Sequence, residues 1–361
     1  MLKQVKNEKL PGLHSLRGIA ALMIVFFHVA GIPQLELPAG WTFINNYFGM
    51  GVPLFFVISA FSLFLSTYKK VGGNGWIQAY FIKRFFRIAP LFYLMLIFFL
   101  LVYYFVFHVV YTQTEIFLNA TFLFNLFPGK HEGIVWAGWT IGVEMLFYLL
   151  LPYLLVHVRS LRTALLCSTM CIIISIAARK MYESLGLASS YPYMSLLSQL
   201  GVFSTGIPAY FLYEKYRTHP AGNRIGQALL FCSVLLLIWA VTCWSFILSV
   251  FGYRIYVWAI IFSLLILSQL FYPFMLISNK MFVYLGEISF SLYILHPMLV
   301  YGLKPLYKKI YCLALYPGYA YLLCVTLTLT LLVPMAHLVY TYVESRSIKA
   351  GKWLVDNRIT P

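Results

Sequence analysis

Arg17 and His28 are the first residues in the chain whose types and spacing could support chemistry, because both interrupt an apolar segment. They are eleven residues apart, which at about 100° per residue places them within roughly 20° of one helical face. At about 1.5 Å per residue they lie roughly 16.5 Å apart along the axis. A basic anchor and a titratable imidazole so placed would suit a long ligand lying along the helix. The alternative is structural, with Arg17 reaching lipid head groups and His28 hydrogen-bonded in the core.

Arg84 and Arg87 form a second candidate pair, in the segment KRFFRIAPLFY. Their i, i+3 spacing puts both guanidinium groups on one face at the expected start of a helix. The planar fork of arginine matches phosphate oxygens bidentately, so the pair predicts a phosphate-binding site. The alternative is that both arginines anchor the helix at the cytoplasmic surface of a membrane.

Glu144 is a rare acidic residue within an apolar segment, and Tyr148 shares its face at i+4. A carboxylate that orients an imidazole is a common arrangement for a general base. We therefore expect Glu144 to lie at the depth of His28 and to be its partner. The alternative is a protonated or hydrogen-bonded structural glutamate.

Ser289, Tyr293 and His296 form a polar stripe on an apolar segment, at positions i, i+4 and i+7. Such a stripe could support a site or provide only interhelical hydrogen bonds. Glu344 is the remaining candidate acidic residue. The chain contains no G-x-S-x-G, H-E-x-x-H or phosphate-loop motif and no metal-ligand cluster, which disfavours a serine hydrolase, a zinc enzyme and an ATP-driven pump.

The elements that must position these residues are membrane spans. Of the 361 residues, 62% are hydrophobic and 10% charged, whereas soluble domains carry about 25% charged residues. The sequence predicts an all-α integral membrane protein, a bundle of about ten transmembrane helices in one domain over residues 1–361, with short tails at about 1–13 and 344–361. The expected spans are approximately 14–33, 47–67, 86–110, 138–158, 162–179, 193–213, 226–248, 253–272, 282–303 and 318–343.

The formal net charge of +16 reflects membrane topology and does not indicate nucleic-acid binding, because the basic residues occupy short loops between apolar segments. Most of them fall on the side of the N-terminus, which predicts that both termini are cytoplasmic. The six cysteines contain no C-x-x-C pair, so we interpret them as packing residues.

Six segments, read together, resemble the acyltransferase-3 family of membrane O-acyltransferases. They occur in the family's order and extend from residue 13 to about 347. The segments are LHSLRGIAALMIVFFHVA (13–30), GVPLFFVISAF (51–61), RFFRIAPLFYL (84–94), WTIGVEMLFYLLLP (139–152), GEISFSLYILHP (286–297) and YVESRS (342–347).

The resemblance implies transfer of an acyl group, most often acetyl, from cytoplasmic acyl-coenzyme A to a sugar hydroxyl of a cell-surface polysaccharide or its lipid-linked precursor. It implies a bacterial inner-membrane location, no permanently bound cofactor and no metal; a homo-oligomer stays open. Matched by motif, the catalytic residues are His28 and Glu144, and the donor-binding residues are Arg17, Arg84 and Arg87. The acceptor or supporting residues are Tyr148, Ser289, Tyr293, His296 and Glu344.

Two other classes of function remain open at this stage. A transporter could use His28 and Glu144 as a proton relay, although the Arg84–Arg87 pair and the absence of inverted repeats argue against it. A partner subunit of a glycan synthase, without activity of its own, is the third possibility.

Overall fold

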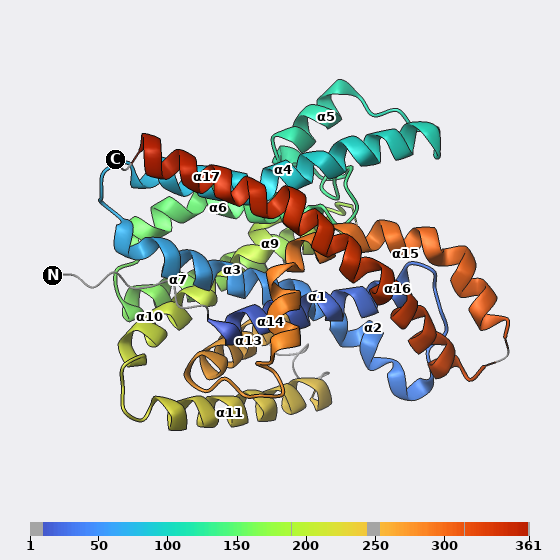
Figure 1. Cartoon of the computed structure of the whole chain (residues 1–361). Coiled ribbons are helices and arrows are strands. Elements are labelled where there is room, and N and C mark those ends of the chain that lie inside the picture. The colour runs from blue at the N-terminus through green and yellow to red at the C-terminus, as the bar shows by residue number, and fades with distance from the viewer. Residues whose placement is uncertain (1–9, 189, 244–252, 314, 360–361) are drawn as a thin grey trace.

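The computed structural model describes residues 10–188, 190–243, 253–313 and 315–359. Within these ranges the regular elements are all helical (Figure 1). The longer helices are α1 (Pro11–Gly31), α3 (Gly51–Thr67), α4 (Trp76–Phe105), α6 (Trp139–His157), α7 (Leu161–Ser184), α9 (Leu196–Ser204), α10 (Gly206–Tyr216), α11 (Gly222–Thr242), α13 (Arg254–Phe271), α14 (Lys280–Glu287), α15 (Ser289–Tyr311), α16 (Pro317–Val339) and α17 (Ser345–Arg358).

The protein is an all-α polytopic membrane protein, as the composition predicted. Eight of the described helices are long and apolar enough to cross a membrane, or nine if α14 and α15, which meet at a bend of 75°, form one span. The count of ten is not confirmed. The span predicted at 193–213 corresponds mainly to α9 and α10, which are interrupted at Thr205 and are each too short to cross alone.

The start of α4 differs from the prediction by ten residues. The helix begins at Trp76, after Gly75 in a left-handed conformation, whereas the charged segment around Arg84 suggested a start near residue 86. Because α4 is already helical before these charges, Arg84 and Arg87 lie two to three turns inside it. Both side chains line a cavity between α4, α1 and α6.

Helix α1 lies at the centre of the bundle and packs against α3, α13, α14 and α15 (Figure 1). Its closest approach is to α14, where Gly18 faces the backbone of Phe282 and Gly286 faces the carbonyl of His14. A Cβ atom at either glycine would overlap the opposing main chain. Side-chain-free positions of this kind let two membrane helices approach closely, and they fix the position of α15, which follows α14.

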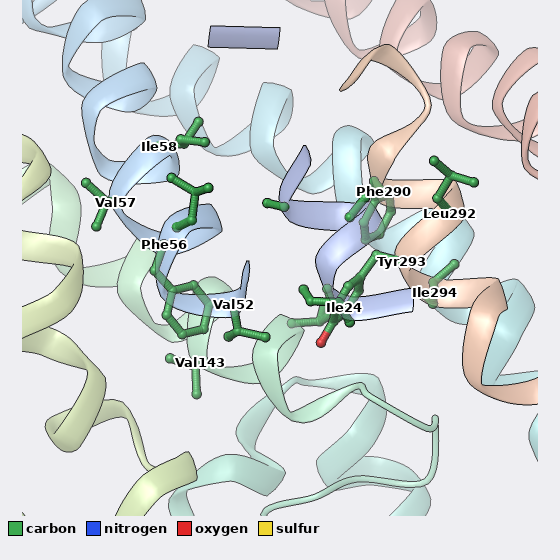
Figure 2. Close-up of a cluster of buried hydrophobic side chains, with 14 of the residues drawn as sticks. Ile24, Val52, Phe56, Val57, Ile58, Val143, Phe290, Leu292, Tyr293 and Ile294 are labelled. Atoms are coloured by element: carbon green, nitrogen blue, oxygen red, sulfur yellow. The ribbon is translucent and has the colours of Figure 1, made fainter. Parts of the chain in front are cut away.

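The central core is completed by apolar side chains from four helices. Figure 2 shows Ile24 of α1 beside Tyr293 of α15, with Val52 and Phe56 of α3 close to Val143 of α6. All five of these side chains are buried. Because this cluster fills the space between the helices, it holds the neighbouring polar side chains at a fixed depth.

The C-terminal part of the chain forms one long helical rod, coloured orange to red in Figure 1. Helix α16 continues through a π-helical segment, η5 (Tyr340–Glu344), into α17, which packs along α4. The predicted tail from residue 344 is thus a helix held against the bundle. π-Helical segments in α-helices are frequent at functional sites, and this one ends at Glu344.

The connection predicted at 111–137 is a folded loop. It contains α5 (Gln113–Ala120), which begins with a capping box between Thr112 and Glu115, and the short helix η4 (Leu123–Leu126). Hydrogen bonds from Thr112 keep the pKa of Glu115 below its usual value. Asn119 accepts a hydrogen bond from the backbone of Ile134 at 2.9 Å, so the loop holds the segment that precedes α6.

The contact between α1 and α14 yields a stability prediction. Gly286→Ala should destabilise the protein by about 1–3 kcal/mol or more, because the added methyl group meets the His14 main chain and not a movable side chain. The thermal midpoint and the size-exclusion profile of the detergent-solubilised protein would measure this effect. Gly302→Ala in α15 is the matched control, because no atom lies within 4 Å of its added methyl group. Equal midpoints for the two variants would show that the close approach is not required.

Candidate active site

His28 and His296 form a hydrogen-bonded pair between α1 and α15. The His28 Nδ1 atom lies 2.8 Å from the His296 Nε2 atom, and the ring centroids are 4.8 Å apart. His296 is fully buried, whereas His28 lines the largest described cavity, of about 880 Å³. His28 is therefore the imidazole that a ligand in this cavity can reach, and His296 supports it from behind.

The hydrogen-bond roles of the two rings follow from a second hydrogen bond of His296. The His296 Nδ1 atom lies 2.5 Å from the carbonyl oxygen of Tyr293. A carbonyl oxygen only accepts, so Nδ1 carries the proton and the Nε2 atom of a neutral His296 must accept. It accepts from the Nδ1–H group of His28, and this leaves a lone pair on His28 Nε2. That nitrogen can take a proton or attack an electrophilic carbon.

Glu144 is not the hydrogen-bonding partner of His28, which corrects the pairing expected from the sequence. Its Oε1 atom accepts hydrogen bonds from the hydroxyl groups of Ser59 and Tyr148, both at 2.6 Å. The i+4 relation to Tyr148 is as expected, but Ser59 of α3 was not identified from the sequence. Its only signal there was a hydroxyl in an apolar helix, which is common in membrane bundles.

Glu144 instead shares a small cavity, of about 50 Å³, with three arginines: Arg17, Arg84 and Arg87. These arginines come from α1 and α4. The Nε atom of Arg84 is buried without a hydrogen-bond partner among the described residues. Three guanidinium groups around one cavity carry more positive charge than Glu144, which lines the cavity, and Glu344, which lies 3.8 Å from Arg87, can neutralise together. The cavity is therefore suited to an anion with several oxygen atoms.

Arg17 and Arg87 also contact residues near the C-terminal part of the chain. The Arg17 Nε–H group donates to the Ser289 hydroxyl at 3.3 Å. The Arg87 guanidinium lies 3.8 Å from Glu344, a distance that makes a loose ion pair. Glu344 is buried and its other oxygen accepts from the Ser291 hydroxyl at 2.9 Å. The π-helical segment thus places Glu344 where it holds Arg87 toward the bundle interior.

Tyr293 lies between the two ends of the site. Its hydroxyl donates to the carbonyl of Ala137 at 3.2 Å and accepts from Thr140 at 2.9 Å. Ala137 has a φ of 59°, a left-handed conformation that is unfavourable for alanine. The folded loop before α6 therefore places the carbonyl of Ala137, a residue with a strained backbone conformation, against Tyr293. The sequence gives no signal for this contact.

Three cavities lie in series between the two ends of the site, and adjacent cavities share lining residues. The large cavity at His28 is followed by one of about 60 Å³, and Tyr293 lines both. Arg17 and Glu144 line this middle cavity and also the cavity at Arg84 and Arg87. Along α1, His28 lines the large cavity and Arg17 lines the other two. The sequence-predicted residues thus lie along one path, but His28 and Glu144 lie at different places on it.

A multi-span helical bundle with a hydrogen-bonded histidine pair at a large cavity and a separate arginine-lined cavity is suited to group transfer within a membrane. The comparison with known proteins defines the class. The model of the acyltransferase domain family matches residues 10–338, and the chain belongs to this family, the acyltransferase-3 family. It is an acyltransferase, as the six sequence segments predicted.

A relative from Acidianus two-tailed virus, described as "Putative acetyltransferase ORF330", is 31% identical over 300 residues. The matched region covers 79% of this chain and 82% of the relative. No solved structure matches the chain.

The geometry predicts different kinetic effects for His296 and Glu144. His296→Ala should lower kcat for acyl transfer by roughly 10²-fold without changing the KM for the acyl donor, because it releases the ring of His28 from its orientation. His296→Asn should recover part of the loss, since an amide oxygen can accept from His28 Nδ1–H. Glu144→Gln should act mainly on the donor KM, because Glu144 lies among the arginines.

Steady-state kinetics of the purified protein would separate these effects, with His28→Ala as the inactive reference. The opposite result would restore Glu144 as the functional partner of His28. In that case His296→Ala would have a normal kcat, and Glu144→Gln would have a low kcat with an unchanged donor KM.

Proposed function

We propose that the protein is an O-acyltransferase that moves an acyl group from acyl-coenzyme A to a sugar hydroxyl of a surface glycan or its lipid-linked precursor. Within this class we propose an O-acetyltransferase in preference to an enzyme for larger acyl groups. The observation that supports this most strongly is the series of three cavities, with shared lining residues, between the arginines and the free nitrogen of His28. An acyl-coenzyme A molecule has the matching chemistry, with phosphates at one end and a thioester at the end of a long thin arm.

The donor would enter at the arginines. Arg17, Arg84 and Arg87 would hold phosphate oxygens, and Arg84 has a buried donor free for this purpose. The small and middle cavities, of about 50 and 60 Å³, are too narrow for a nucleotide. The nucleotide would therefore stay at the arginine end while the pantetheine arm extends past Tyr293 to His28. The basic residues near the N-terminal side support a cytoplasmic position for this end.

The chemical step uses the lone pair of His28 Nε2. The hydroxyl oxygen of the acceptor attacks the thioester carbon while His28 Nε2 takes the hydroxyl proton. The resulting imidazolium donates its Nδ1–H group to His296, which keeps the ring in place. Cleavage of the carbon–sulfur bond then releases the coenzyme A thiolate, which recovers the proton from His28 and leaves as the thiol. The alternative two-step route has Nε2 attack the thioester first and pass the acyl group on.

The arginine cavity yields a prediction for donor binding. Arg84→Lys keeps the charge but loses the planar fork, and it should raise the KM for acetyl-coenzyme A by roughly tenfold or more. Arg87→Lys should have a similar effect, combined with loss of the contact to Glu344. Arg162→Lys is the control, because Arg162 lies at the start of α7 and lines none of these cavities. Unchanged donor affinity in both variants, with normal yield and size-exclusion profile, would exclude Arg84 and Arg87 as phosphate ligands.

The decisive experiment is acyl transfer by the purified protein. Radiolabelled acetyl-coenzyme A is mixed with glycan that has been extracted from the source organism and deacylated with mild alkali. Label should move to the glycan with release of free thiol for the wild type and not for His28→Ala. In the transporter alternative, His28-dependent proton movement into proteoliposomes would occur without thiol release. If the well-folded protein shows neither acyl transfer nor proton movement, the result would favour a partner subunit of a glycan synthase.

A further inference from the structure

The wall of the large cavity contains two arginines that the reaction described above does not use. Arg179 lies near the C-terminal end of α7, and Arg254 is the first residue of α13. Both line the same cavity as His28, and both are half-buried. They lie at the end of the bundle where α1 finishes, opposite the end with most of the basic residues. Membrane anchoring by the positive-inside rule therefore does not account for them.

Arg179 is held in place by aromatic rings and not by a carboxylate. Its guanidinium carbon lies 4.1 Å from the ring centroid of Tyr253 and 5.5 Å from that of Tyr193. Its Nε atom is buried and has no hydrogen-bond partner among the described residues. One edge donor of Arg179 is directed at the Tyr256 hydroxyl. Stacking uses the faces of a guanidinium group and leaves the remaining edge donors available for an oxyanion.

The surrounding groups strengthen this charge pattern. Arg254 makes a longer cation–π contact at the same cavity, 5.9 Å from the ring centroid of Tyr47. Two acidic side chains in this region accept hydrogen bonds from hydroxyl groups: Glu183 accepts from Tyr253 at 2.6 Å, and Glu132, which also lines the cavity, accepts from Ser190 at 2.7 Å. In the described part of the chain, no carboxylate forms an ion pair with Arg179.

The other walls of the cavity are suited to a sugar. Trp136, Trp139 and Tyr193 line it, together with the amide side chains of Asn45 and Asn46. Aromatic faces and amide groups are a common combination in sites that bind the apolar faces and the hydroxyls of a ligand. The cavity volume of about 880 Å³ is in the range of pockets for drug-sized ligands, roughly 300–1,000 Å³. It therefore has room for more than one sugar unit.

We propose that Arg179 and Arg254 form an anion subsite for the acceptor, so that the acylated glycan carries a carboxylate or phosphate close to the hydroxyl that reacts. This inference rests on the proposed function and adds to it the charge class of the acceptor. The subsite positions the acceptor and takes no part in proton transfer, which remains with His28. Two sources of the anion fit: an acidic sugar, or the diphosphate of a lipid-linked precursor.

Binding can be tested without any transfer activity. The thermal midpoint of the purified full-length protein is measured with methyl β-glucuronide, inorganic pyrophosphate or the neutral methyl β-glucoside. One of the two anions, or both, should raise the midpoint of the wild type while the glucoside does not. Stabilisation by the glucuronide points to an acidic sugar. Pyrophosphate can also bind at Arg17, Arg84 and Arg87, so only the part of its shift that is lost in Arg179→Gln and Arg254→Gln points to a lipid-linked diphosphate. The shift caused by the glucuronide should disappear in both variants. Lys180→Gln is the matched control, because Lys180 is adjacent and exposed but does not line the cavity.

The transfer assay provides the second readout. With deacylated glycan as acceptor, Arg179→Gln and Arg254→Gln should raise the KM for glycan by tenfold or more and leave the KM for acetyl-coenzyme A unchanged. Arg179→Lys should retain part of the affinity. Mass spectrometry of the labelled unit should find a carboxylate or phosphate on it or on its neighbour.

The outcomes separate the two levels of the proposal. Either of two results would overturn the anion subsite while leaving the acyltransferase function intact. One is that the labelled sugar unit and its neighbours are all neutral. The other is that Arg179→Gln and Arg254→Gln behave like Lys180→Gln in both assays. Failure of the wild type to transfer label from acetyl-coenzyme A would instead remove the proposed donor and acceptor. The thermal measurements with the three small molecules would still decide whether the anion subsite exists.

Discussion

The close approach of α1 to α14 is the constraint on which the rest of the site depends. Gly18 and Gly286 leave no space for a side chain between the two helices. Because α15 follows α14 directly, this contact fixes α15 beside the face of α1 that carries the polar residues. Two polar pairs then form between α1 and α15, Arg17 with Ser289 at one depth and His28 with His296 at another. A small change in the contact between α1 and α14 would shift both pairs together.

The buried polar groups show how the bundle tolerates ionisable residues in an apolar environment. A charge at the centre of a spanning helix costs on the order of 2.5–3.5 kcal/mol, so each one needs a compensating contact. Glu144 receives two hydroxyl hydrogen bonds, and Glu344 receives one together with the nearby guanidinium of Arg87. The histidine pair needs no counter-charge, because two neutral rings satisfy each other through one shared hydrogen bond.

The separation of the arginine cavity from the histidine pair has a functional meaning for a membrane acyltransferase. Tight binding of a ligand's charged end positions its reacting bond only if the spacing between the arginine cavity and His28 is fixed. Here α1 supplies that distance, since Arg17 and His28 lie on one helix. In the proposed function the acceptor would occupy the large cavity, so the donor and the acceptor would approach the same nitrogen from opposite ends. They would then not compete for one entrance.

The sequence by itself determined the all-helical membrane class, most of the helix positions and the acyltransferase family. These depend on local apolar length and on ordered motifs, which need no knowledge of packing. It also placed Arg17 and His28 on one helical face, because helical geometry is local. The tertiary structure alone decided which polar groups meet. Glu144 was expected beside His28 because both were polar and at similar distances from helix ends. The observed partner of His28 is His296, because the glycine contact brings α15, not α6, against α1 at that depth. The continuous helix around Arg84, the π-helical turn that directs Glu344 inward and the stacked Arg179 likewise depend on neighbours that lie far away in the chain.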